Sequence, residues 1–127
     1  MIKGIGIDSV EQDRISRVLS KYGQRFQDKI LGPQEKKEIE IKLTQFQKVR
    51  YLSNNFACKE AFSKALGLGF SDGIFPKDIE ILRDTKGKPY IRLSGNAKKL
   101  TNKLDIQKIN VSITDTSNLS TAFVIGE

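Results

Sequence analysis

Residues 56–69 read Phe-Ala-Cys-Lys-Glu-Ala-Phe-Ser-Lys-Ala-Leu-Gly-Leu-Gly and are the most informative stretch of the chain. At 3.6 residues per turn, Glu60 and Lys64 stand within about 40° of each other around a helix, so they share one face. An apolar stripe that can pack on a core lies on the opposite side, and its members are Ala57, Cys58, Ala61, Phe62, Ala65 and Leu66. The stretch therefore predicts a buried helix that carries charge on one face and ends at glycine.

The charged face of this helix has two interpretations. Glu at position i with Lys at i+4 is the favoured orientation of an ordinary surface pair, worth about 0.2–0.5 kcal/mol. A face that carries Glu60, Ser63 and Lys64 and ends at Gly67 and Gly69 can also hold a metal ion and a phosphate together, because backbone at glycine can approach a ligand closely.

A second carboxylate stands far from Glu60 in the sequence. Residues 2–7 form a short apolar run with small residues, which predicts a buried strand that delivers Asp8 to its end. In the alternative interpretation, Asp8 or Ser9 is only the N-cap of the following helix, with Glu11 or Gln12 completing a capping box.

The remaining periodicities predict an α+β fold with a mostly antiparallel sheet packed with a long central helix, in a single domain over residues 1–127. The capping pair Thr44 and Gln47 and the stop at Gly67 define the long helix. The expected helices cover 10–22, 33–43, 45–66 and 96–104, and the expected strands cover 2–7, 79–81, 90–93, 108–114 and 119–125.

Composition excludes several classes of protein. No apolar run of about 18 residues exists to cross a bilayer, and Lys3 and Asp8 interrupt the apolar start before a signal peptide could form, so we expect a soluble protein. The single cysteine, Cys58, falls on the apolar stripe and suits packing in a reducing cytoplasm. Because the chain has no histidine, it cannot use an imidazole base or a histidine-ligated zinc.

The formal charge of +7, from 22 Lys and Arg against 15 Asp and Glu, predicts an anionic partner. Nucleic acid is one candidate, but the chain has no Trp and no interleaving of basic and aromatic residues for stacking on bases. Basic residues recur three or four apart at Arg14, Arg17, Lys21 and Arg25. They predict either a basic stripe that meets an acidic partner or an ordinary solvated face.

Taken together, the motifs resemble the holo-[acyl-carrier-protein] synthases, the small bacterial 4′-phosphopantetheinyl transferases. The resemblance covers nearly the whole chain, and its specificity comes from the order and separation of the motifs. These are Gly4-Ile5-Gly6-Ile7-Asp8 with Val10-Glu11 and Arg14-Ile15, Phe56-Ala57 with Lys59-Glu60-Ala61 and Lys64-Ala65 before Gly67 and Gly69, Asp78-Ile79-Glu80, Gly87-Lys88-Pro89, and Val111-Ser112-Ile113.

The resemblance implies an enzyme that moves 4′-phosphopantetheine from coenzyme A to a serine of apo acyl carrier protein and releases adenosine 3′,5′-bisphosphate, in support of fatty acid biosynthesis. By the same resemblance Asp8 and Glu60 are the ligands of a Mg²⁺ ion and Lys64 neutralises phosphate oxygens. A hard cation with carboxylate ligands suits attack on a pyrophosphate, because negative charge must be stabilised as the phosphate leaves. Either a water on the metal or Glu60 could take the serine proton.

The resemblance also assigns binding residues. Lys64 and Gly67 are expected at the phosphates of coenzyme A, with Lys88 and Pro89 at its adenosine part, although Gly87-Lys88-Pro89 could equally be only a turn. Arg14, with Arg17 and Arg25, is expected to meet the acidic carrier protein. A homotrimer with its active site between subunits is implied, so the metal residues and the coenzyme contacts could come from different chains.

Two positions depart from the pattern of the family. Asn110 stands where His is usual and cannot titrate, so a general base there is excluded. Asn55 stands where Arg is usual, which removes a bidentate phosphate donor, and Lys59 is a candidate for the compensating cation. A nucleic-acid-binding module and a metal-dependent hydrolase of nucleotide pyrophosphates are the competing functions.

Overall fold

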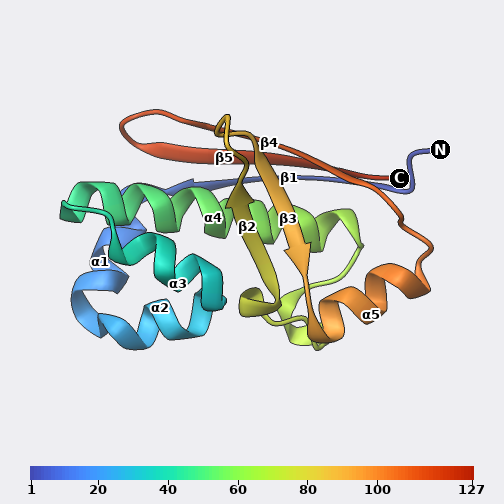
Figure 1. The fold of residues 1–127 in the computed structure, drawn as a ribbon, viewed down its shortest axis with the longest axis horizontal. Helices are drawn as coiled ribbons and strands as arrows, with labels where there is room; N and C mark the ends of the chain where they lie inside the picture. Colours follow the sequence, from blue (N-terminus) through green and yellow to red (C-terminus); the bar gives the residue numbers. More distant parts are fainter.

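The computed structural model describes residues 1–127 and arranges them around one long helix, α4 (Figure 1). The strands are β1 Gly4–Glu11, β2 Ile79–Arg83, β3 Pro89–Leu93, β4 Ile109–Asp115 and β5 Leu119–Gly126. The helices are α1 Gln12–Tyr22, α2 Gln24–Ile30, α3 Pro33–Glu40, α4 Gln45–Ala65 and α5 Gly95–Lys103, with short 3₁₀ turns η1 Phe70–Asp72 and η2 Pro76–Asp78.

An antiparallel sheet in the order β1-β5-β4 lies along one side of α4, and the antiparallel hairpin of β2 and β3 crosses another side (Figure 1). Strand β1 lies very close to the helix backbone. A Cβ atom on Gly4 or Gly6 would come within 1.9 Å of the carbonyl oxygen of Ala65 or Ala61, respectively. Glycine at these two positions therefore brings the strand that carries Asp8 onto the helix that carries Glu60.

The predicted α+β class and long central helix are confirmed. Helix α4 begins at the predicted capping box, in which Thr44 Oγ1 accepts from the backbone N–H of Gln47 at 3.1 Å and Gln47 Oε1 accepts from that of Thr44 at 3.2 Å. The apolar stripe is buried, and burial raises the pKa of the Cys58 thiol to about 12, as expected for a packing residue. None of the helices has the length and apolarity that a bilayer crossing needs.

Three local predictions are wrong. Strand β1 continues through Asp8 to Glu11, so neither Asp8 nor Ser9 caps the next helix, and Glu11 is the N-cap of α1. Helix α2 was not predicted, because its seven residues are mostly polar and show no apolar period. Helix α3 ends at Glu40, before the predicted end at 43.

A fully buried ion pair joins α3 to α4. Lys59 Nζ donates to Glu35 Oε1 at 2.6 Å, to the carbonyl of Ile30 at 2.8 Å and to that of Pro76 at 2.9 Å. Both charged side chains are 0% exposed. Burial lowers the pKa of Lys59 and raises that of Glu35, but the acceptors around Nζ and the N–H donors around the carboxylate match the charged forms.

Lys59→Met is expected to lower the free energy of unfolding by about 3–5 kcal/mol, because it leaves the Glu35 carboxylate buried without its counter-charge. Urea unfolding followed by circular dichroism measures the change. Lys98→Met, an exposed lysine on α5, is the matched control and should shift stability by no more than about 0.5 kcal/mol. Adding Glu35→Gln to Lys59→Met should recover part of the loss, and a further loss instead would contradict this account.

Candidate active site

Asp8, Glu60 and Lys64 meet where β1 lies against the second half of α4. Lys64 Nζ donates to Asp8 Oδ1 at 2.9 Å and to the backbone carbonyl of Ile7 at 3.0 Å. The Asp8 side chain is 18% exposed and that of Lys64 is 54% exposed. Lys64 thus forms its ion pair across two elements, with Asp8, and the local Glu60–Lys64 surface pair that the helical spacing favours is not the pair that forms.

The charged groups around Glu60 act on its pKa. Burial raises the pKa of Glu60, and the nearby negative charge of Asp8 raises it further, while Lys64 and Arg14 act in the opposite direction. A carboxylate whose pKa is raised by a neighbouring carboxylate is stabilised in its charged form by a nearby cation. Arg14, predicted only as a surface contact for a partner, also lies within the electrostatic reach of this site.

The site suits a hard divalent cation that is only partly held by protein. No group of three or more His, Cys, Asp or Glu side chains is close enough to form a complete metal cage. Mg²⁺ typically takes one or two carboxylates and completes its shell with water and substrate phosphates. Asp8 and Glu60 are a donor set of this kind.

Gly67 follows α4 in a conformation that requires glycine. Its φ is +72°, in the left-handed region, and a Cβ atom there would have no neighbour within 4 Å. Its N–H donates to the Lys64 carbonyl at 3.0 Å. The glycine therefore turns the chain at the end of the helix and leaves open space at its own position.

Lys88 and Pro89 lie in a different part of the molecule. Pro89 pairs with Arg83 at the turn end of the β2–β3 hairpin, and the Lys88 N–H donates to Asp84 Oδ1 at 2.9 Å. Within one chain the structure does not bring these residues to Lys64. The turn interpretation of Gly87-Lys88-Pro89 is confirmed, and a binding role for Lys88 and Pro89 stays a prediction.

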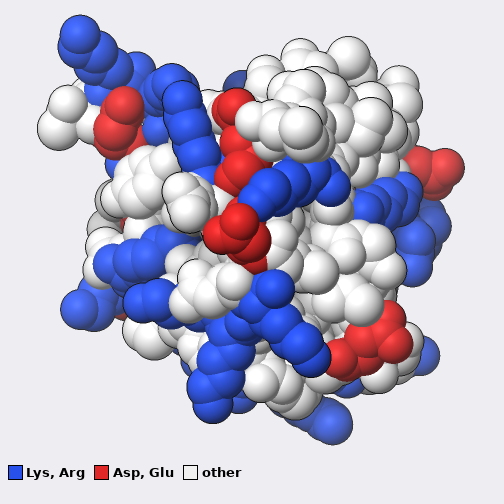
Figure 2. All heavy atoms as spheres, turned by 90° about the vertical axis from the view of Figure 1, so that its right-hand side faces the viewer, with Lys and Arg blue, Asp and Glu red and all other residues white.

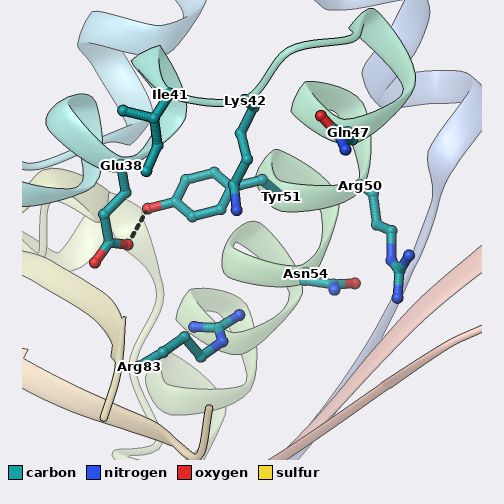
Figure 3. A pocket seen from close by; sticks show the side chains of 8 residues that line it. All are labelled: Glu38, Ile41, Lys42, Gln47, Arg50, Tyr51, Asn54 and Arg83. Carbon is teal, nitrogen blue, oxygen red and sulfur yellow. Dashed lines mark hydrogen bonds between the residues drawn. The ribbon is translucent and has the colours of Figure 1, made fainter. Parts of the chain in front are cut away.

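A basic pocket of about 510 Å³ opens beside this hairpin (Figure 3). Its cations come from the α3–α4 loop, from α4 and from β2, and they are Lys42, Arg50 and Arg83. The other lining residues are Glu38, Ile41, Gln47, Tyr51 and Asn54. Asn54, the pocket residue on α4 nearest to Glu60, lies six residues before it, so about 9 Å of helix separates this basic pocket from that carboxylate.

The sequence prediction missed the basic pocket because its residues come from three separate segments. Lys42 and Arg50 belong to no motif, and the pattern around Arg83 predicts only the polar end of a strand. The only signal was the excess of positive charge. Figure 2 shows this excess at the end of the molecule that carries α5 and the chain termini, where Lys and Arg are spread widely with fewer acidic side chains between them.

Arg14, Arg17 and Arg25 are exposed but do not form one continuous helical stripe. Arg14 and Arg17 lie one turn apart on α1, whereas Arg25 lies on α2 beyond the break at Gly23. Gly23 has a φ of +54°, so the chain turns there and the two helices differ in direction. The predicted stripe is therefore a pair on α1 with a separate cation on α2.

The two departures from the family pattern have defined surroundings. Asn110 Nδ2 donates to Glu127 Oε1 at 3.0 Å. Asn55 is buried, and its Oδ1 accepts from Arg83 Nη2 at 3.2 Å. Lys59 is wrong as the compensating cation, because it is buried and bound to Glu35. Arg83 is the cation that lies beside position 55.

Comparison with known proteins agrees with the arrangement of these residues. The family model described as the 4′-phosphopantetheinyl transferase superfamily matches residues 4–124. A holo-[acyl-carrier-protein] synthase of Halothermothrix orenii is 46% identical over 127 residues, which cover 100% of this chain and 98% of the relative.

Solved structures give the same result. The holo-[acyl-carrier-protein] synthase of Neisseria meningitidis superposes with a TM-score of 0.90 at 38% identity, covering 100% of this chain and 99% of the other. The Helicobacter pylori synthase, solved in complex with coenzyme A, superposes with a TM-score of 0.82 at 30% identity, covering 97% and 99%. The chain therefore belongs to the 4′-phosphopantetheinyl transferase superfamily, and within it to the family of the holo-[acyl-carrier-protein] synthases.

Proposed function

We propose that this protein transfers the 4′-phosphopantetheine group of coenzyme A to a serine of apo acyl carrier protein and releases adenosine 3′,5′-bisphosphate, in support of fatty acid biosynthesis. The observation that carries the proposal is the meeting of Asp8, Glu60 and Lys64 at the contact of β1 with α4. The reaction proposed is that of the holo-[acyl-carrier-protein] synthase family, to which the chain belongs. Because the single cysteine is unpaired and buried, a reducing cytoplasm suits the protein, and we propose that location.

The reaction forms a bond from the serine oxygen to the phosphorus that bears pantetheine and breaks the bond from that phosphorus to the bridging oxygen. The bridging oxygen leaves with the adenosine bisphosphate, and the serine hydroxyl loses its proton. Lys64 is placed to neutralise phosphate oxygens, since its ammonium is half exposed beside Asp8. The open space at Gly67 supports its proposed role at the phosphates.

Asp8 and Glu60 would hold Mg²⁺ in this proposal. When bound, the ion would supply charge neutralisation for the pyrophosphate and its leaving group. Glu60 must bind as the carboxylate, and its raised pKa means that protons compete with the metal at a higher pH than at an ordinary glutamate. Metal affinity is therefore expected to fall as the pH is lowered toward that pKa.

The basic pocket beside Lys88 and Pro89 is proposed to hold the adenosine and phosphate end of coenzyme A. Its cations Lys42, Arg50 and Arg83 complement a nucleotide phosphate. Asn54 of the pocket and Glu60 are about 9 Å apart along α4 and about 120° apart around it, so they face different directions. That separation supports a site in which one chain supplies the carboxylates and a neighbouring copy supplies the pocket.

The outer face of the β1-β5-β4 sheet supports the same assembly. Strand residues alternate between faces, so the face away from α4 carries Ile5, Ile7 and Phe123, which are 61%, 59% and 39% exposed. Ile7 and Phe123 are direct partners in the pairing of β1 with β5. Apolar residues joined in this way mark a contact surface, and we propose that it joins copies of this chain into a homotrimer.

The exposed arginines of α1 and α2 are proposed to meet the acidic surface of the carrier protein. Arg14 lies close enough to Glu60 to affect its pKa, so a carrier that binds this arginine delivers its serine near the carboxylates. Complementary charge of this kind raises the rate of association more than the final affinity.

Arg17→Glu is expected to raise the KM for the carrier by about tenfold and to leave the KM for coenzyme A unchanged, because like charges then face each other. Arg17 is the better test than Arg14, since Arg17 does not act on the pKa of Glu60. Initial rates at two salt concentrations measure the effect, and the variant should depend less on salt. Lys37→Glu, exposed on α3, is the control. An equal rise in both KM values for Arg17→Glu would assign Arg17 to the coenzyme site instead of the carrier site.

The proposed reaction is tested by incubating the protein with coenzyme A, Mg²⁺ and an apo carrier protein and measuring the intact mass of the carrier. A mass increase equal to one phosphopantetheine, with release of adenosine 3′,5′-bisphosphate, is the expected result. Release of the nucleotide without modification of the carrier would instead favour a pyrophosphate hydrolase.

A further inference from the structure

Asn55 is an unusual residue to bury in the middle of a packed helix. It is 0% exposed on α4, and a buried amide is tolerated only when its polar atoms are paired. Its Nδ2 donates to Glu35 Oε2 at 2.8 Å and to the carbonyl of Ile81 at 3.2 Å. Its Oδ1 accepts from Arg83 Nη2 at 3.2 Å. Every polar atom of the Asn55 side chain is thus engaged.

The donors and acceptors around the Asn55 amide fix its orientation. The Ile81 carbonyl and the Glu35 carboxylate can only accept hydrogen bonds, so they must face the NH₂ group of Asn55. A flipped amide would place its oxygen against both acceptors and its NH₂ group against the Arg83 guanidinium, which can only donate. The oxygen of Asn55 therefore faces Arg83.

Glu35 cannot turn away to release Asn55. Its Oε1 accepts from Lys59 Nζ at 2.6 Å and from the backbone N–H of Gly32 at 3.0 Å. Its Oε2 accepts from Asn55 and also from the backbone N–H of Ile81 at 3.2 Å. A carboxylate held from both oxygens in this way is a rigid support for its neighbours.

In this hydrogen-bonded network of Glu35, Asn55 and Arg83, the member that reaches solvent is Arg83. It is half-buried on β2 and lines the basic pocket, where Figure 3 shows its guanidinium directed toward the middle of the group of lining residues. The bond to Asn55 is its shortest, since those to the carbonyls of Ile81 and Leu82 measure 3.5 and 3.4 Å. Asn55 thus accepts the shortest of the three hydrogen bonds that orient the guanidinium.

We propose that Asn55 and Glu35 are positioning residues for Arg83. The buried carboxylate orients the amide, and the amide oxygen holds the guanidinium at the basic pocket so that its remaining N–H groups face a phosphate. This proposal rests on the proposed function, in which the basic pocket receives coenzyme A. An oriented guanidinium binds an anion more tightly, because less rotamer freedom is lost on binding.

Calorimetry with coenzyme A and steady-state kinetics test the proposal on Asn55→Ala, Arg83→Ala and the double variant. Each single variant is expected to bind coenzyme A about tenfold more weakly, as befits a lost hydrogen bond to a charged group, and the double variant should bind no more weakly than Arg83→Ala. The KM for coenzyme A should rise with kcat unchanged, a split that a general loss of folding does not produce. Asn55→Leu keeps the number and branching of the side-chain heavy atoms and serves if Asn55→Ala folds poorly.

Ser53→Ala is the matched control, since Ser53 is also 0% exposed on α4 and its hydroxyl has no hydrogen-bond partner. Its affinity for coenzyme A should equal that of the parent. Additive losses in the double variant, or unchanged affinity in Asn55→Ala beside a loss in Arg83→Ala, would overturn the positioning role alone. Unchanged affinity in Arg83→Ala overturns the pocket assignment with it, whereas the transfer reaction itself is judged separately by the mass of the carrier.

Discussion

Asp8→Ala and Glu60→Ala are each expected to slow transfer by at least about a thousandfold, equivalent to about 4 kcal/mol of barrier. In the proposed site, either change leaves one carboxylate to hold the cation that would neutralise the pyrophosphate. Both side chains lie at the edge of the packed core, so the variants should remain folded. Initial rates of carrier modification measure the first effect, and thermal unfolding checks the fold.

Direct metal binding separates a lost ligand from a lost fold. Mn²⁺ binding followed by electron paramagnetic resonance should weaken in both variants in the presence of coenzyme A. Asp13→Ala removes an exposed carboxylate from α1 and should leave rate and metal affinity unchanged. A rate within about tenfold of the parent in either Asp8→Ala or Glu60→Ala would rule out the two-carboxylate site.

Phe123→Asp is expected to convert the proposed homotrimer to monomers and to lower the rate of transfer by at least about a hundredfold. The substitution places a charge in the middle of the apolar outer face, where a buried unpaired charge is costly. If two copies complete each site, loss of the interface separates the carboxylates from the basic pocket. Light scattering after size-exclusion chromatography gives the mass, and the intact mass of the carrier gives the rate.

Leu104→Asp is the matched control for this interface. Leu104 is 43% exposed, close to the 39% of Phe123, but it follows α5 rather than lying on the sheet. Its variant should keep the mass and activity of the parent. A monomeric Phe123→Asp with full activity would show that each chain carries a complete site.

The helix that carries Glu60 was predictable because its signals are local. Thr44 and Gln47 define its start, and Gly67 its end. The partner of Lys64 was not predictable from spacing, since Asp8 lies 56 residues away and is brought near by the Gly6 contact. Lys59 misled the prediction for a related reason: α4 is buried on nearly all sides, so even a lysine outside the predicted apolar stripe lies inside.

The basic pocket shows the other limit of sequence reasoning. Its cations belong to no motif, and the amide at position 55 reads as the loss of a phosphate donor. Only the fold shows that β2 brings Arg83 to the same place. The sequence thus predicted the residues that the family motif marks. It missed Arg83, which lies beside position 55 of the helix but belongs to a strand.

The pairing of the first strand with the last one affects how the protein folds during its own translation. Strand β1 finds its only sheet neighbour in β5, with Asp8 opposite Ala122. During translation β1 therefore has no strand to pair with until residues 119–126 have left the ribosome, and contacts at such sequence separation form slowly. The sheet contacts of residue 8 therefore form only after nearly the whole chain has been made, so in a nascent or truncated chain the proposed catalytic centre lacks the support of β5.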